Sequence, residues 1–389
     1  MHIAIITNRL IKGEGQGRVN VALAQAAARH GHVVTCLAHR VDNRLLTEPN
    51  VEWAHMPDAN NPVALIGNQR FARASTRWLN RHGTDVDFVV ANGFNTWAPT
   101  DLNIVHFVHS AWRQSDAHDA HLRSVHGAYQ WLYSRLNARL ERTALSRAQH
   151  VVAVSEKVRT ELIELGMSPH ALSVIHNGVD IEEFAPGTVS RQTLGLPNVP
   201  LALFAGDIST TRKGLDTMLE ALQHVPGLHL AVAGQTDGSP FPALAEQLGV
   251  ADRTHFLGFR ADMPILMQAA DVFVFPSRYE ACSLVLLEAM SAGLPVITAQ
   301  TAGGAELISS DAGVVLPDPD DATALAAALN QLTTDPNRLT KMRAAARTLA
   351  EDHSWDRMGI EYLRLFETLS RQKSERIAPI PHASSLSLR

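Results

Sequence analysis

The stretch of sequence that most constrains the fold lies at residues 271–297. It begins with an apolar run, Val272–Phe275, which has the length and composition of a buried strand. A short polar turn follows, and then a helix that begins near Ser283. Gly293 and Pro295 end that helix, and a second apolar strand comes next. The order strand, helix, strand predicts a βαβ unit, whose parallel strands lie in a sheet covered by helices.

Two carboxylates, Glu280 and Glu288, stand on either side of the start of this helix. The unpaired N–H groups of a first helical turn suit a phosphate, whereas carboxylates suit the hydroxyls of a sugar or a ribose. Two glutamates at this spacing also occur on the solvated face of an ordinary βαβ unit, so the spacing alone does not decide between the two readings. The combination with a helix start predicts a site for an anionic ligand that carries hydroxyls, such as a sugar nucleotide.

The same α/β rhythm runs twice along the 389 residues. Apolar runs predict strands at 2–7, 33–38, 88–91, 104–108 and 151–154, and again at 201–205, 228–233, 255–257, 272–275 and 295–298. A chain of this length makes two domains of about 150–200 residues each. We therefore predict two doubly wound domains whose ligands lie at the carboxyl ends of the strands. The expected divisions are an N-terminal domain at 1–178, a linker at 179–198, a C-terminal domain at 199–352, a helix at 353–370 that packs back on the first domain, and a disordered tail at 371–389.

The amino-acid composition argues against several classes of function. Lys and Arg number 34 against 39 Asp and Glu, so no global basic field favours nucleic acid. The two cysteines, Cys36 and Cys282, make neither a disulfide framework nor a metal pattern, which suits a reducing cytoplasm. The first residues lack the pattern of a secretory leader, and no run approaches the ~20 apolar residues of a membrane span. We expect a cytoplasmic protein.

A glycine-rich loop, Gly13 to Arg18, is predicted between the first strand and a helix over 19–30. Its glycines allow a close backbone approach and positive φ, and the helix start could receive a phosphate or a sugar hydroxyl. A flexible turn without a ligand is the alternative. The dinucleotide fingerprint G-x-G-x-x-G is absent, because the spacing here is G-x-G-x-G and no acidic residue follows about 20 residues later. A two-domain dehydrogenase is therefore disfavoured.

Two cations, Arg212 and Lys213, precede a predicted helix at about 214–223. Positive side chains at a helix N-terminus oppose the helix dipole, so their presence there indicates an anion. A solvated pair of charges is the simpler alternative. Over a diphosphate, such cations would oppose the negative charge that develops when a nucleotide leaves.

These motifs together resemble the GT4 family of retaining glycosyltransferases, whose GT-B fold has two Rossmann-like domains facing a central cleft. Glu280 and Glu288 match its E-x7-E signature, and 301–307 resembles its second glycine-rich loop. The resemblance implies that Glu280 binds hydroxyls of the transferred sugar and that Glu288 binds the ribose. It implies backbone N–H contacts to sugar and phosphate from Cys282, Ser283, Leu284 and Val285, and donor contacts from Gly15, Gly17 and Arg18.

The same resemblance singles out His109, at the end of a predicted strand, as a residue that meets the transferred sugar. It places the nucleobase near Phe259 and Arg260, although a plain turn capped by Asp262 explains that segment equally well. Lys213 matches the family lysine, but Asp207 stands where the family has an arginine. Arg212 or Arg18 would then supply the second cation. The expected catalytic residues are His109, Glu280 and Lys213.

The implied activity is retaining transfer of a hexose-type sugar from a nucleotide diphosphate sugar to a hydroxyl of a glycan or lipid-linked glycan. No D-x-D motif and no ligand-spaced His, Asp or Glu cluster occurs, so we expect neither a metal nor a cofactor. Two alternatives remain, a nucleotide-sugar 2-epimerase of the same fold and a non-catalytic glycan-assembly scaffold, which the departure at Asp207 motivates.

The stretch 121–150 carries five arginines against Glu141 alone. Leu132, Leu136 and Leu140 form one helical stripe beside them. Such a helix could rest on an anionic membrane surface, whereas a stripe of this kind more often belongs to the core. Peripheral membrane contact is therefore a second expectation for this segment.

Overall fold

A seven-stranded parallel sheet forms the centre of the N-terminal half of the protein. The computed structural model describes residues 1–60, 63–115 and 125–377. The sheet has the order β5-β3-β1-β6-β7-β8-β9, and its inner strand β1 carries Ile3 and Ile5 with no exposed surface. The strands are β1 His2–Ile6, β3 Val33–Ala38, β5 Val51–His55, β6 Phe88–Asn92, β7 Thr100–Val105, β8 Ala148–Ala153 and β9 Leu172–Val174, and a separate pair is β2 Arg9–Leu10 with β4 Arg40–Val41.

Helices connect these parallel strands, as the α/β pattern predicts. They are α1 Gly15–Arg29, α2 Ala64–His82, α3 His109–Trp112, α4 Val125–Leu145 and α5 Glu156–Glu164, with short 3-10 turns at η1 Leu45–Thr47 and η2 Pro169–Ala171. The predicted strand at 104–108 is displaced, because β7 ends at Val105 and His109 already begins α3.

The glycine-rich loop prediction was wrong in its extent. Gly15, Gly17 and Arg18 form the first turn of α1, and none of the three glycines between Gly13 and Arg18 has a positive φ. A Cβ on Gly17 would lie 2.4 Å from the carbonyl oxygen of Ile11. Glycine is needed at this position because the incoming chain passes close to the helix, and not because the backbone is left-handed.

A second parallel sheet, of six strands in the order β12-β11-β10-β13-β14-β15, forms the C-terminal half. Its strands are β10 Leu201–Ala205, β11 His229–Ala233, β12 Thr254–Phe256, β13 Val272–Phe275, β14 Val296–Ala299 and β15 Gly313–Leu316. Its connecting helices are α6 Leu215–Gln223, α7 Phe241–Gln247, α8 Met263–Ala269, α9 Leu284–Ser291 and α10 Ala322–Thr334, with η4 Thr211–Lys213, η5 Ala251–Arg253 and η6 Ala305–Leu307. The predicted architecture, two doubly wound α/β halves, is confirmed.

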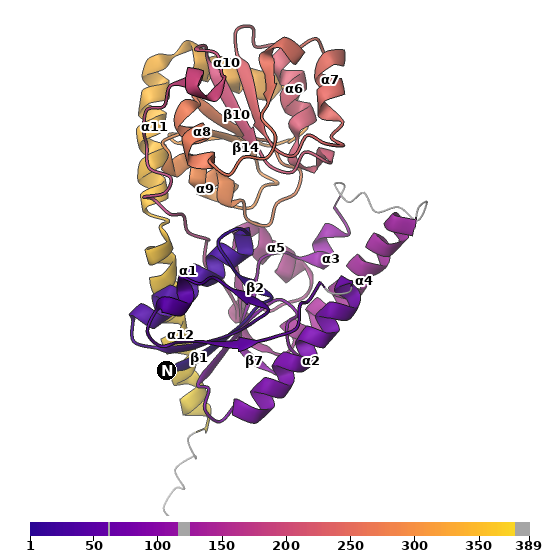
Figure 1. Cartoon of the computed structure of the whole chain (residues 1–389), viewed down its shortest axis with the longest axis vertical. Helices are drawn as coiled ribbons and strands as arrows, with labels where there is room; N and C mark the ends of the chain where they lie inside the picture. The colour runs from indigo at the N-terminus through magenta and orange to yellow at the C-terminus, as the bar shows by residue number, and fades with distance from the viewer. Residues whose placement is uncertain (61–62, 116–124, 378–389) are drawn as a thin grey trace, which may run out of the picture.

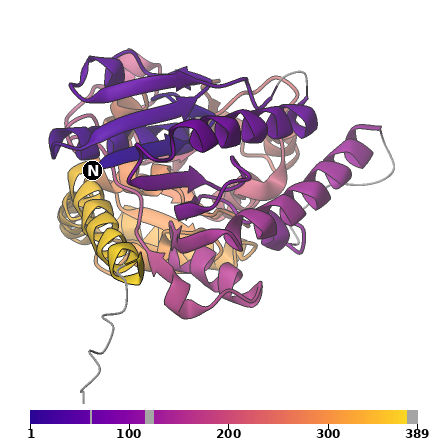
Figure 2. The ribbon, with the colours of Figure 1, turned by 90° about the horizontal axis from the view of Figure 1, so that it is seen from below.

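Two long helices follow one another along one side of the molecule, one on each half (Figure 1). α11 Pro336–Glu351 belongs to the upper lobe, and α12 Trp355–Ile377 descends beside α1. Phe366 of α12 packs 4.8 Å from Phe88 of β6, ring centre to ring centre, so the predicted return to the first domain is confirmed. Seen from below, α12 lies against the outside of the first lobe (Figure 2). The tail prediction was wrong for 371–377, which are helical, and its remaining part, 378–389, lies outside the described residues.

The predicted linker runs between β9 and β10 and contains the 3-10 turn η3 Arg191–Leu194. The N–H of its first residue, Val179, donates to the carbonyl of His353 at 2.9 Å. The Val179 carbonyl accepts from the N–H of Trp355, at the start of α12, at 3.2 Å. The linker and the returning chain therefore pass between the lobes together. Within the described ranges, no helix is both long and apolar enough to cross a membrane.

Candidate functional site

A pocket of about 550 Å³ opens at the carboxyl ends of the second sheet. Its floor comes from the ends of β10, β11 and β13, and its sides come from the start of α9 and from Gly15 of α1 in the other lobe. This is the sheet edge at which doubly wound folds bind ligands. The pocket, called the donor pocket below, collects many of the predicted donor residues, namely Gly15, Lys213, Phe259, Arg260, Glu280, Cys282, Ser283, Leu284 and Val285.

Glu280 lies at the centre of a charge cluster in the donor pocket. One of its carboxylate oxygens accepts from the Arg212 guanidinium at 2.8 Å and also from the Lys213 ammonium. The side chains of Glu280 and Lys213 are only 14% and 13% exposed, and burial lowers the pKa of Lys213. The structure therefore brings together the carboxylate predicted to bind the sugar and both cations predicted to bind phosphate.

A glycine fixes where the two cations stand. Gly214 follows η4 with a φ of 76°, and a Cβ there would lie 2.1 Å from the carbonyl oxygen of Pro276. The turn between β10 and α6 thus packs directly on the turn after β13. This close approach holds Lys213 and Glu280 in the same pocket.

The second glycine-rich loop supports the segment that carries Glu280. The Gly303 N–H donates to the Glu280 carbonyl at 2.9 Å, and the Ser283 N–H donates to the Gly303 carbonyl at 3.0 Å. A Cβ on Gly303 would lie 1.8 Å from the Ala281 carbonyl oxygen, so a larger residue would push the two segments apart. The predicted loop at 301–307 is therefore in contact with the site.

The start of α9 faces the donor pocket through Ser283, Leu284 and Val285. Ser283 is the N-cap residue but makes no capping hydrogen bond with its side chain, which is consistent with a helix start left open for a ligand. Burial raises the pKa of the neighbouring Cys282 thiol to about 12. A thiol this weakly acidic is a poor nucleophile.

The far end of the pocket carries the residues predicted for a nucleobase. The Phe259 ring is 78% exposed, so one face is open to a planar group. The Arg260 guanidinium donates twice to the Asp262 carboxylate, at 2.7 and 2.6 Å. Asp262 is thus engaged by Arg260 and does not cap α8 with its side chain.

Glu288 lies apart from the lining of the donor pocket and is paired across the lobes. Its carboxylate accepts from Arg18 of α1 at 3.0 Å, and Arg18 also contacts Glu183 and lies over the Phe184 ring. Burial raises the pKa of Glu288 to about 7. In this conformation Arg18 is hydrogen bonded to the carboxylate predicted to bind a ribose. The two residues lie 270 positions apart, so sequence patterns carry no signal for this pair.

A second, more polar pocket of about 280 Å³ lies in the first lobe, and His109 lines it. Burial lowers the pKa of His109 to about 4, so its imidazole is neutral near pH 7. His106, also on the lining, is hydrogen bonded to Asn92 at 2.8 Å. Gly17 lines this pocket and not the donor pocket. Gly15 lines the donor pocket and Gly17 lines this one, so both pockets lie beside the first turn of α1.

Glu141 was not predicted as a site residue, yet it shapes this pocket. Its carboxylate accepts from the backbone N–H groups of His109 at 2.9 Å and Ser110 at 3.3 Å, and it is 4% exposed. It therefore fixes the start of α3 and with it the position of His109. The signal was present in the sequence, since Glu141 is the one acidic residue of an arginine-rich helix.

We expect Glu141→Gln to flatten the pH dependence of stability. Burial raises the pKa of Glu141 to about 7 from an ordinary 4.5, so between these values the folded protein holds more protons than the unfolded chain. The free energy of unfolding of the wild type should then fall as the pH rises, by about 2 kcal/mol from this group between about pH 5.5 and pH 8. Urea unfolding at both pH values measures this, with exposed Glu164→Gln as the control. Equal slopes for wild type and Glu141→Gln would contradict it.

Among residues 1–60, 63–115 and 125–377, no group of three or more His, Cys, Asp or Glu side chains could hold a metal ion.

Comparison with known proteins gives matches over both lobes. The family model Glycosyltransferase Family 4 matches residues 13–183, and the model Glycosyl transferases group 1 matches 188–349. A D-inositol 3-phosphate glycosyltransferase of Xylanimonas cellulosilytica is 32% identical over 254 residues, which are 61% of this chain and 61% of that protein. The lipopolysaccharide glucosyltransferase WaaG of Escherichia coli is 41% identical over 158 residues, 39% of this chain and 42% of WaaG. The chain thus matches less than two thirds of the length of these relatives.

Solved structures share the fold over nearly the whole chain. Sucrose-phosphate synthase from Thermosynechococcus elongatus superposes with a TM-score of 0.79 at 21% identity, covering 96% of this chain and all of that one. The structure of WaaG gives a TM-score of 0.73 at 22% identity, covering 92% of this chain and 98% of that one. The predicted GT-B fold is confirmed by these likenesses.

Proposed function

Because the chain belongs to the GT4 family of glycosyltransferases, we propose that it moves a hexose-type sugar from a nucleotide diphosphate sugar to an acceptor hydroxyl. The observation that carries this proposal is the convergence of two cations on Glu280, since Lys213 lines the donor pocket with Glu280 and Arg212 pairs with the same carboxylate beside it. Two cations beside a carboxylate match a diphosphate joined to a sugar, and exposed Phe259 offers a surface for the base. A solvated pair of surface charges would not converge on one partly buried carboxylate.

We further propose that the anomeric configuration is retained and that no metal or cofactor takes part. The acceptor oxygen forms a bond to the anomeric carbon as the bond from that carbon to the phosphate oxygen breaks. The leaving phosphate takes the acceptor proton on the same face of the sugar. Lys213 and Arg212 stand where they can stabilise the diphosphate as its charge develops. This step needs no protein nucleophile, and burial keeps the Cys282 thiol protonated by raising its pKa to about 12.

The acceptor would be a glycan or a lipid-linked glycan that enters through the polar pocket beside His109. Asparagines supply much of its lining, at positions 8, 60, 68, 92, 95 and 137. Amide groups both donate and accept hydrogen bonds, which suits the hydroxyls of a carbohydrate. Related proteins differ in acceptor, since their names specify inositol phosphate and lipopolysaccharide.

Calorimetric titration with UDP, GDP and ADP tests the donor site. Binding of one nucleoside diphosphate is expected, and a panel of nucleotide sugars scored for slow hydrolysis then identifies the sugar without an acceptor. The absence of binding by all three would reject the catalytic proposal and favour the scaffold. Release of a 2-epimeric sugar without transfer would favour the epimerase.

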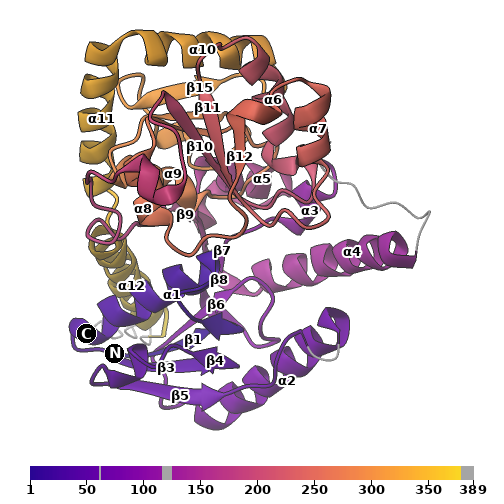
Figure 3. The ribbon, with the colours of Figure 1, turned by 45° about the horizontal axis from the view of Figure 1, so that its top comes forward.

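We also propose that α4 rests on an anionic membrane surface. The exposed face of α4 carries Leu132, 51% exposed, together with Arg135, Arg139 and Arg142, while its acidic residue Glu141 is buried and neutralises none of them. The helix projects beyond the sheet of the first lobe (Figure 3). Leu140, by contrast, is 8% exposed, so the predicted apolar stripe is divided between core and surface. Residues 121–124 of the predicted segment lie outside the described ranges.

A vesicle assay tests this contact. The double variant Arg135→Glu, Arg139→Glu should lose about 30-fold or more in binding to vesicles with an anionic lipid fraction, because each of the two basic residues near such a surface contributes about 1 kcal/mol and the new carboxylates are repelled. Binding to neutral vesicles should be weak for both proteins. The same charge reversal at exposed Arg357 and Arg371, on α12, is the matched control. Equal binding by the α4 variant and the wild type would rule out this helix as the contact.

A further inference from the structure

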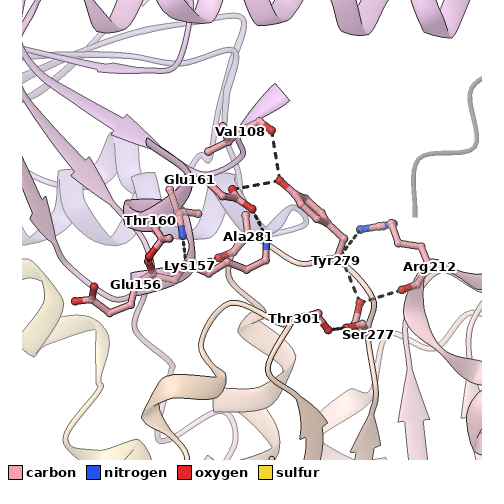
Figure 4. Close-up of polar contacts among 12 residues, drawn as sticks. Val108, Glu156, Lys157, Thr160, Glu161, Arg212, Ser277, Tyr279, Ala281 and Thr301 are labelled. Atoms are coloured by element: carbon pink, nitrogen blue, oxygen red, sulfur yellow. Dashed lines mark hydrogen bonds and ion pairs between the residues drawn. The ribbon is translucent and has the colours of Figure 1, made fainter. Parts of the chain in front are cut away.

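Tyr279 belongs to the second lobe, but its side chain lies in the first. It directly precedes Glu280 and is 4% exposed. Its hydroxyl lies 3.3 Å from a carboxylate oxygen of Glu161 on α5 and 3.4 Å from the carbonyl oxygen of Val108. Figure 4 shows the ring reaching from its loop toward these two acceptors. The residue next to the proposed sugar-binding carboxylate is thus hydrogen bonded to the opposite lobe.

A buried ion pair holds the hydroxyl's partner in place. Lys157 and Glu161 stand one turn apart on α5 and form a salt bridge with side chains 19% and 11% exposed. The Lys157 ammonium also lies 3.8 Å from the centre of the Tyr279 ring. A cation over an aromatic face is attracted to it, and more strongly where water is excluded. The tyrosine is therefore held by its hydroxyl and by its ring.

The Tyr279 ring also packs on residues that flank His109. The Tyr279 ring centre is 5.7 Å from that of Phe107 and 5.0 Å from that of Trp112. Phe107 in turn lies 5.0 Å from the His109 ring in an edge-on contact. The tyrosine thus contacts both ends of the short segment that presents His109.

The main chain at Tyr279 is hydrogen bonded to a residue beside the donor pocket. Its carbonyl accepts from the Arg212 guanidinium at 3.4 Å, and that guanidinium also binds Glu280. One residue beyond Glu280, the Ala281 carbonyl accepts from Ser155 at the start of α5 at 2.6 Å. Tyr279 is therefore hydrogen bonded to both lobes on one side of Glu280, and Ala281 is hydrogen bonded to the first lobe on the other.

We propose that Tyr279 is a positioning residue that sets the distance between Glu280 and His109 across the two lobes. This inference rests on the proposed transfer reaction. Transfer requires the donor sugar, held from the second lobe, to meet an acceptor held from the first. Reaction rates fall steeply when such groups are misplaced by even an ångström. Tyr279 lines neither pocket, yet it adjoins Glu280 in the chain and packs on the residues that flank His109, which suits this role.

Two substitutions distinguish the contribution of the Tyr279 hydroxyl from that of its ring. Tyr279→Phe keeps the ring packing but removes the hydrogen bonds to Glu161 and Val108. It should lower kcat for transfer about tenfold, with the donor KM and the nucleoside diphosphate Kd within about twofold of wild type. Tyr279→Leu also removes the contacts with Lys157 and Trp112 and should lower kcat further. Tyr362→Phe is the matched control, since Tyr362 is equally buried and its hydroxyl has no hydrogen-bond partner within the described part of the chain.

A kcat of Tyr279→Phe equal to that of the wild type would overturn the inference. A parallel fall of kcat, nucleotide affinity and melting temperature would also overturn it, because a general structural defect lowers all three. Hydrogen exchange gives a readout that does not depend on activity. Tyr279→Phe should accelerate exchange at 107–113 and 279–283 and leave α12 unchanged, and Tyr362→Phe should do neither. Unchanged exchange at both segments would overturn the inference, whereas failure of the wild type to bind any nucleotide would reject the proposed function alone.

Discussion

Glu280→Gln should reduce the rate of sugar transfer by roughly 100- to 1000-fold while leaving the affinity for the nucleoside diphosphate nearly unchanged. The proposed role of this carboxylate is to accept hydrogen bonds from hydroxyls of the transferred sugar, which glutamine cannot do with both of its terminal atoms. Its contacts with Arg212 and Lys213 would weaken as well, but the two cations would remain free for the phosphates. Nucleotide binding should therefore survive, or strengthen slightly.

The measurement pairs steady-state transfer kinetics with calorimetry on the free nucleoside diphosphate. Glu280→Ala should behave similarly, with an added loss of stability because it leaves a space beside two partly buried cations. Exposed Glu246 of α7 gives a matched Glu→Gln control. Unchanged turnover in Glu280→Gln would remove the carboxylate from the sugar site, and a large loss of nucleotide affinity would show that it organises the phosphate site instead.

Much of the second lobe could be predicted because its strands are short apolar runs bounded by turn residues. The strands at 201–205 and 272–275 match β10 and β13 at both ends. The strands that escaped prediction lie at sheet edges. β5 reads VEWAH with most of its side chains partly or fully exposed, and β9 and β15 have three and four residues. Edge strands bury little on either face, so their hydrophobic pattern is weak.

The start of α1 was mispredicted because local propensity and tertiary packing disagree there. Glycines at 15 and 17 disfavour a helix by roughly 1 kcal/mol each, which makes a loop the natural prediction. The close contact of Gly17 with Ile11 requires a glycine within the helical turn, and packing prevails. The consequence reaches the site, because the helical register directs Arg18 toward Glu288.

In the candidate site too, features that are local in the sequence could be predicted, whereas contacts between distant positions could not. Motifs close in sequence predicted the lining of the donor pocket, including Lys213, Glu280 and the start of α9. The contacts that sequence could not supply join distant positions, such as Tyr279 with Glu161 and Arg18 with Glu288. Each belongs to the interface between the lobes, where the pairing depends on how two folded units meet and not on a repeating pattern.

Lys213→Met should weaken binding of the nucleoside diphosphate about 100-fold and lower the transfer rate by a comparable or larger factor. Methionine keeps most of the length of the side chain and its packing while removing the charge. Lys213 is largely buried in the donor pocket, so its charge acts on a phosphate with little screening by water. Binding of the free nucleoside, which lacks phosphates, should change less than about twofold.

Arg212→Met tests which residue supplies the second phosphate-binding cation, a question that Asp207 raises. Asp207 stands where related enzymes are expected to have an arginine, and either Arg212 or Arg18 could supply that second cation. Arg18 is engaged with Glu183 and Glu288, whereas Arg212 lies beside Lys213 on Glu280. We therefore expect Arg212→Met to weaken diphosphate binding about tenfold or more, and less than Lys213→Met does, because Arg212 is the more exposed of the two. Equal weakening of nucleoside and nucleoside diphosphate by Lys213→Met would argue against a phosphate contact, and a larger effect at Arg18 than at Arg212 would move the second cation to α1.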